Sequence, residues 1–167
     1  MSIKALVRRG YGVLINVGNW LQSPLLLLVR LYWGWQFAQS GWGRLHHLDT
    51  ATEFFASLGL PAPRLNAIFI SNLELVGGVL LAIGLGSRLI AFLLAGDMTV
   101  AYLTAARDAI QAIFSDPGKF YNADPYTFWF ASIMVLVFGP GKLSVDYLLA
   151  KRWEKSGEAT MAERRGA

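Results

Sequence analysis

The chain has 167 residues, of which 54% are hydrophobic and 16% are charged, and it carries a formal net charge of +4. This length suits one domain, and the clustering of the apolar residues points to a membrane protein. The chain contains no cysteine, which excludes disulfides, thiol catalysis and Fe–S ligation within it.

Four stretches are candidates for membrane spans, since about 20 apolar residues cross the roughly 30 Å of hydrocarbon. The fourth is short, because Asp124-Pro125 is typical of a helix start. The expected fold is therefore all-α, an integral membrane four-helix bundle with short interfacial helices. The candidate spans cover about residues 20–39, 66–85, 89–106 and 121–138. The expected divisions are a basic interfacial segment at 1–19, a membrane domain at 20–150 and a basic tail at 151–167.

Lysine and arginine are unevenly divided between the two sides of this bundle. Ten lie in the N-terminal segment, the second connection and the C-terminal tail, against four in the first and third connections. The positive-inside rule therefore predicts a multi-pass protein of the bacterial inner (plasma) membrane with both termini cytoplasmic. The lipid bilayer accounts for the basic charge, and no aromatic-basic pattern indicates nucleic acid.

Two connections carry helix signals of their own. In the first, Thr50 and Glu53 match a capping box, and Gly59 with Pro61 is a stop signal. A short helix at 51–58 is expected to place Phe54 and Phe55 as a lid over the outer end of the bundle. After the fourth span, Ser144 is the expected cap of an amphipathic helix on the cytoplasmic surface.

Three ionisable residues, Arg30, Glu74 and Asp97, interrupt the apolar spans. Helical rise places all three near the middle of the membrane, where isolated charges are costly. They are therefore expected to face one another, with Arg30 contacting Glu74. Ser71 shares the face of Glu74, and Thr104 shares the face of Asp97.

One cation against two acids leaves this cluster with a formal charge of −1, so one carboxyl must be protonated, shared or balanced by another group. Three interpretations stay open. The cluster is a structural ion pair that specifies helix packing, a polar pocket for a quinone head group or small anion, or a proton or ion path.

His46 and His47 are the only histidines and are weak metal-ligand candidates. With Asp49 or Glu53 they would form a partial metal site, but a solvated interfacial pair is the favoured interpretation. No Ser–His–Asp pattern is present, so a self-contained hydrolase is not expected.

Several segments, taken in order, resemble the DoxX family of small membrane proteins across about residues 24–150. They are the early basic residue of the first span, Gly41 with Arg44, Phe54-Phe55, Gly59-Leu-Pro61, Glu74-Leu-Val-Gly-Gly78, Gly84-Leu-Gly-Ser-Arg88 and Gly139-Pro-Gly-Lys-Leu-Ser-Val-Asp146. The resemblance implies a four-helix membrane protein. Relatives include membrane subunits linked to thiosulfate–quinone oxidoreduction and others associated with redox or sulfur-stress systems.

The functional hypothesis is a membrane subunit of a redox-linked, quinone-interacting system that relates to sulfur or oxidative stress. It is not expected to be a stand-alone enzyme, because no redox-centre motif is found; soluble partner proteins would supply the redox centres. The alternatives are a small ion-coupled transporter that uses the Arg30, Glu74 and Asp97 cluster, and a non-enzymatic membrane scaffold.

Overall fold

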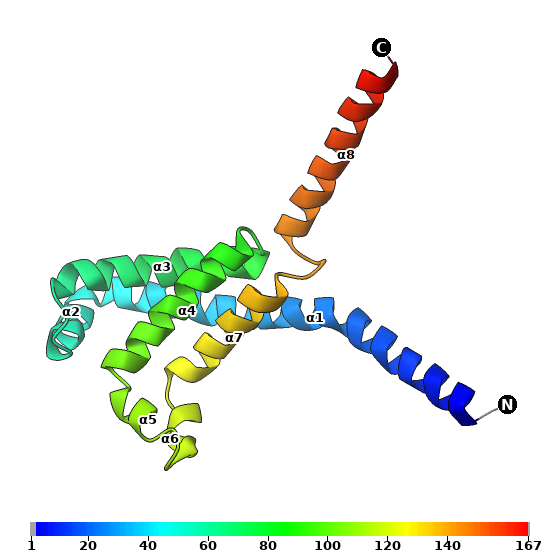
Figure 1. The fold of residues 1–167 in the computed structure, drawn as a ribbon. Helices are drawn as coiled ribbons and strands as arrows, with labels where there is room; N and C mark the ends of the chain where they lie inside the picture. Colours follow the sequence, from blue (N-terminus) through cyan, green and yellow to red (C-terminus); the bar gives the residue numbers. More distant parts are fainter. Residues whose placement is uncertain (1–2, 167) are drawn as a thin grey trace.

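The computed structural model describes residues 3–166, and every regular element in this range is a helix (Figure 1). The prediction of an all-α chain is confirmed. The elements are α1 (Ile3–His46), α2 (Leu48–Ser57), α3 (Pro63–Ile83), α4 (Ser87–Thr104), α5 (Arg107–Gln111), α6 (Pro117–Tyr121), α7 (Pro125–Phe138) and α8 (Val145–Gly166).

Three of these helices, α1, α3 and α4, are long and apolar enough to cross a membrane. The fourth apolar helix, α7, has 14 residues, which corresponds to about 21 Å of helical rise and is shorter than the hydrocarbon core. The chain is therefore an all-helical membrane protein with three span candidates and one short apolar helix beside them.

The first helix is much longer than the sequence predicts. α1 runs for 44 residues without interruption, includes Pro24, and bends in its N-terminal half (Figure 1). The expected end of the first span at Gln39 is wrong, because the helix continues to His46. Both expected divisions, at 19/20 and at 150/151, fall inside continuous helices.

α1 and α3 pack against each other so closely that only glycine fits at three points of contact. A Cβ atom on Gly78 would lie 2.6 Å from the backbone nitrogen of Ala38, and one on Gly34 would lie 2.7 Å from the carbonyl oxygen of Gly78. A Cβ atom on Gly41 would lie 2.5 Å from the backbone nitrogen of Leu75. Small residues allow this approach of two backbones in a membrane, and Gly41 packs on α3 instead of ending α1.

α4 and α7 form the second helix pair and lie across the first (Figure 1). Trp129 Nε1 donates to Thr99 Oγ1 at 3.0 Å between them, and Tyr102 Oη donates to the carbonyl of Phe120 at 2.8 Å. The shared core joins both pairs through buried apolar side chains, among them Phe37, Leu81, Leu94 and Val135.

The connection after α1 differs from its predicted form. α2 begins at Leu48, its N-cap residue is His47, and no side chain caps it. The predicted capping box of Thr50 and Glu53 is therefore wrong, because both residues lie inside the helix. The stop signal holds, since α2 ends at Ser57 and Gly59 follows with a φ of +72°.

The segment that leads from α7 into the first turn of α8 contacts the turn between α3 and α4 through a hydrogen bond. Ser144 Oγ accepts a hydrogen bond from the backbone nitrogen of Tyr147 at 3.2 Å, as expected for the helix cap. The nitrogen of Asp146 donates to the carbonyl of Gly84 at 2.9 Å. From this junction α8 projects away from the other helices (Figure 1).

Candidate functional site

Arg30 does not contact Glu74, so the predicted pair is wrong. The Arg30 side chain is fully buried, its guanidinium lies against Gly84, and its Nη2 donates to the carbonyl of Leu143. Glu74 precedes Gly84 by ten residues on the same stretch of chain, which is about 15 Å of helical rise. The two side chains belong to different levels of the bundle.

The reason is the antiparallel register of α1 and α3, which places Gly41 beside Ser71 and Arg30 beside Gly84. The depth expected for Arg30 rests on a first span of about residues 20–39, with Arg30 about ten residues from its inner end. Because the helix continues to His46, Arg30 lies at the level of the α3–α4 turn, where backbone carbonyls and a carboxylate are available. It is a buried cation at one end of the bundle.

Asp146 supplies the negative charge nearest to this cation. Its carboxylate accepts hydrogen bonds from the backbone nitrogens of Gly86 at 2.7 Å and Ser87 at 2.8 Å, at the start of α4. Burial raises the pKa of Asp146, but these hydrogen bonds and the charge of Arg30 outweigh burial and bring it below its ordinary value. We call Arg30, the turn at Gly84–Ser87 and Asp146 the end junction.

Glu74 pairs instead with Arg44, near the other end of α1. Arg44 Nη1 lies 2.8 Å from Glu74 Oε2, and Arg44 Nη2 donates to Ser40 Oγ at 2.9 Å. Glu74 is 1% exposed, whereas the Arg44 side chain is 35% exposed. Asp97 of α4 is also buried and lies close enough to Glu74 and Arg44 to line one small cavity with them. The structure thus brings the two acids together with a different cation.

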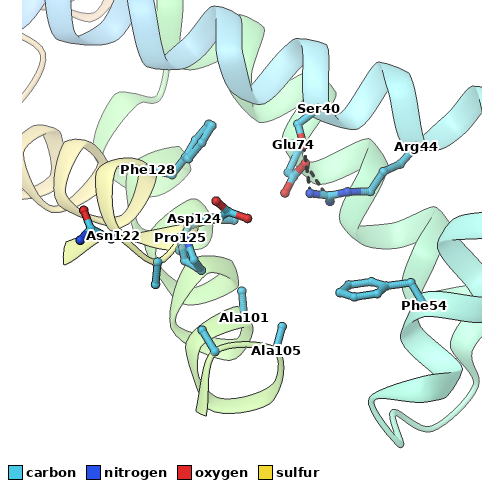
Figure 2. Close-up of a pocket in the computed structure, with 13 residues that line it drawn as sticks. Ser40, Arg44, Phe54, Glu74, Ala101, Ala105, Asn122, Asp124, Pro125 and Phe128 are labelled. Carbon is cyan, nitrogen blue, oxygen red and sulfur yellow. Dashed lines mark hydrogen bonds and ion pairs between the residues drawn. The ribbon is translucent and has the colours of Figure 1, made fainter. Parts of the chain in front are cut away.

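Arg44 and Glu74 lie in the wall of a cavity of about 580 Å³ between the α1–α3 pair, the α4–α7 pair and α2. Phe54 and Phe128 face it from opposite sides, and Asp124 lies between them (Figure 2). Ala101 on α4 and Ala105 at its C-cap leave the cavity open, because their side chains are small. A second cavity of about 100 Å³ also borders Glu74 and Arg44 and reaches Asp97 and Thr104.

Comparison with known proteins places this arrangement in a family. The sequence model of the DoxX family matches residues 25–107. A protein of Bacillus subtilis (strain 168) named "Putative oxidoreductase CatD" is 30% identical over 125 residues, covering 75% of this chain and 87% of that protein. The chain belongs to the DoxX family. No solved structure matches it. The segment that matches the DoxX model contains Arg44, Glu74 and Asp97, whereas Asp124 and Phe128 lie beyond it.

The remaining predicted site residues of this DoxX protein have different roles. Ser71 is fully buried, and its hydroxyl contacts no hydrogen-bond partner. Thr104 lines the second cavity, and its hydroxyl donates to the carbonyl of Val100 at 2.7 Å. Phe54 is 52% exposed and forms a cavity wall, whereas Phe55 is buried with Ala51 and Ala67 and holds α2 against α3.

The side chains of both histidines contact backbone carbonyl oxygens of α1. His46 Nδ1 lies 2.9 Å from the carbonyl oxygen of Trp42, and His47 Nδ1 lies 3.1 Å from that of Gly43. Among the residues that the structure describes, no group of three or more His, Cys, Asp or Glu side chains is arranged to hold a metal ion. The structure gives the histidines local contacts at the end of α1.

Sequence reasoning missed Arg44, Ser40, Asp124 and Phe128 as cavity residues. Arg44 was assigned to a loop, although Ser40 and Arg44 are four residues apart and share one helical face. Asp124 occupies the predicted N-cap position of α7, but its side chain makes no capping hydrogen bond and faces the cavity (Figure 2). No local apolar signal places Arg44 on the first helix, because residues 39–46 are largely polar and include Gly41 and Gly43.

The chemistry of the DoxX cavity follows from its few polar atoms. Glu74 Oε2 lies in ion-pair range of Arg44 but without an aligned hydrogen bond, and Asp97 Oδ2 also contacts no donor. Buried polar atoms are normally hydrogen-bonded, so these oxygens are available to a proton or a ligand. A mainly apolar cavity of this size with a few convergent polar groups is typical of a small-molecule site.

Proposed function

We propose that this DoxX protein is the membrane subunit of a redox-linked system and that its cavity binds the head group of a quinone. The observation that carries the proposal is the ion pair of the buried Glu74 with the partly exposed Arg44 in the wall of the cavity, with Asp97 beside them in the smaller cavity. The relative named as an oxidoreductase supports a redox association.

The residues of the cavity fit such a ring. Phe54 and Phe128 supply apolar faces on two sides (Figure 2), and the Arg44 guanidinium supplies donors for a quinone carbonyl oxygen. A protonated carboxyl of Glu74 or Asp97 would supply another donor. A quinone takes up electrons together with protons; the electrons would come from soluble partner proteins, because the chain has no cysteine and no redox-centre motif of its own.

The proposal includes an orientation. Both termini lie in the cytoplasm of a bacterium, and the cavity opens toward the opposite side of the inner membrane. The uneven distribution of lysine and arginine supports this orientation. The end junction would then face the cytoplasm and the Arg44–Glu74 pair would lie toward the periplasmic side.

Binding of short-chain ubiquinone and menaquinone analogues to the protein in lipid nanodiscs tests the proposal. Native mass spectrometry of gently purified protein would show whether quinone is retained. Ala101→Trp fills the cavity and should weaken binding at least roughly tenfold, about 1.4 kcal/mol. Leu103→Trp is the matched control, because Leu103 is 53% exposed on the same helix and does not line the cavity.

Equal affinity of the two tryptophan variants, or no saturable binding by the wild type, would refute the quinone site. Proton or cation flux across liposomes without quinone binding would instead favour the transporter. A protein with neither property would be a scaffold. Glu74→Gln should weaken quinone binding, and the exposed Glu53→Gln on α2 should not.

A further inference from the structure

Two buried carboxyl groups lie close together between the helices, with one cation beside them. Glu74 on α3 is 1% exposed and Asp97 on α4 is 8% exposed, and both line the same cavity of about 100 Å³ together with Arg44. Ionised carboxylates have only acceptor atoms, so two of them cannot form a hydrogen bond. The proximity of the two carboxyl groups becomes favourable when one of them carries a proton, because that group is then a hydrogen-bond donor without a charge.

The charges around this pair agree with one proton. Arg44 of α1 is the cation beside it, and Asp124, the N-cap residue of α7, lines the larger cavity with Arg44 and Glu74. From α2, Phe54 lines both cavities and Phe55 lines the smaller one, and neither carries a charge. With a single proton on the carboxyl pair, Arg44, Glu74 and Asp97 together are neutral, which lowers the free-energy cost of burying them in a membrane.

The pair also has a route to the surface. The cavity is large enough for several water molecules, and it extends from Glu74 to Asp124 (Figure 2). Asp124 is exposed, and its side chain is free of a capping hydrogen bond at the start of α7. An exposed carboxylate at the cavity mouth is suited to exchange protons with bulk water.

We propose that Glu74 and Asp97 form a proton-binding site that holds one shared proton beside Arg44, and that Asp124 exchanges this proton with the outside water. The site depends on the chain's own groups alone. Only its use, as the proton donor in a hydrogen bond to a quinone carbonyl, rests on the proposed function.

Infrared difference spectroscopy of the protein in nanodiscs tests the site without any ligand. At neutral pH the wild type should show a carbonyl stretch of a buried protonated carboxylic acid that shifts in heavy water. Glu74→Gln leaves Asp97 beside Arg44, and Asp97→Asn leaves Glu74 paired with it. Each variant should therefore lose the band, whereas Asp108→Asn, an exposed acid outside the cavity, should keep it.

A carbon-13 label in the aspartate carboxyl groups gives an assignment that needs no variant, since part of the band must move if Asp97 shares the proton. Asp124→Asn should keep the band and slow its exchange in heavy water roughly tenfold or more, and Asp116→Asn should leave the rate unchanged. A wild type without the band, or a band that survives in both buried-acid variants, would overturn the proton site. An unchanged rate of exchange in Asp124→Asn would refute the role of Asp124 in exchanging the proton with outside water. An intact band without quinone binding would refute the proposed function alone.

Discussion

Arg44 on α1 reaches Glu74 on α3 with its Nη1 2.8 Å from Oε2, while Ser40 Oγ accepts a hydrogen bond from its Nη2 at 2.9 Å. The acid is buried and the cation is one third exposed. The pair therefore joins two helices at the wall of the cavity, and its two members are not equivalent: Glu74 depends on Arg44 more than Arg44 depends on Glu74.

Arg44→Leu should destabilise the protein because Glu74 would stay buried without a cation. Loss of one partner of a fully buried pair costs about 3–5 kcal/mol, and the exposure of Arg44 should reduce the loss to about 2 kcal/mol. Unfolding in mixed micelles measures it. Arg44→Leu with Glu74→Leu should recover most of the loss, and Arg64→Leu on the exposed start of α3 is the control. A double variant no more stable than Arg44→Leu would contradict this account.

Gly78→Ala should separate α1 from α3. Its Cβ would lie 2.6 Å from the nitrogen of Ala38, a backbone atom that cannot move alone. Gly77→Ala is a control in the next position, since its Cβ would meet only the side chains of Leu94 and Ile90 at 3.4 Å and beyond. The melting temperature in detergent should fall by several degrees for Gly78→Ala and change little for Gly77→Ala. Equal melting temperatures would show that the helices are not in this close contact.

Gly84→Ala should destabilise the protein more than Gly86→Ala. Both glycines have positive φ, +76° and +60°, so both substitutions incur a backbone strain of about 1–2 kcal/mol. A Cβ on Gly84 would also collide with the Arg30 guanidinium, whereas nothing lies within 4 Å of one on Gly86. Thermal unfolding of the two variants isolates the contribution of the buried arginine. Equal losses would show that Arg30 does not lie against this turn.

Asp146 should make stability depend on acid pH. Its pKa in the folded protein lies below the ordinary value of 3.8, so its ionised form stabilises the fold at pH values above that value. This stabilisation decreases as the pH falls through the folded pKa. Asp146→Asn should lower the melting temperature at pH 7 and flatten its decline below about pH 4. Parallel acid profiles for variant and wild type would refute this role.

The orientation is testable with reporter fusions. Fusions at Gly86 and at the C-terminus should report the cytoplasm, and fusions at Leu60 and Gly118 should report the periplasm. In chain order, the four positions Leu60, Gly86, Gly118 and the C-terminus come after α1, α3, α4 and α7. The pattern therefore also decides whether the short α7 crosses the membrane. A C-terminus on the same side as Gly118 would remove α7 from the spans.

The sequence predicts the helical class and the short fourth helix because both depend on local composition and length. It also places Glu74 and Asp97 at matching depth, since each lies near the middle of a helix whose ends are marked by turns. Arg30 was misplaced because the end of the first helix has no local signal. Gly41 and Gly43 look like breakers, and only the contact of Gly41 with the α3 backbone explains why the helix continues. A register between two helices is a tertiary property that a single helix does not encode.

The length of α1 has a consequence for how the protein responds to its bilayer. From Pro24 to His46 the helix rises about 34 Å, which already matches the hydrocarbon thickness. The preceding residues 7–22 are almost entirely exposed and include Leu14, Trp20 and Leu21. We expect lipid to cover these side chains, with this part of α1 along the membrane surface or inserted into a thicker membrane. With the bend in its N-terminal half, α1 can adapt to hydrophobic mismatch while its C-terminal half stays fixed against α3.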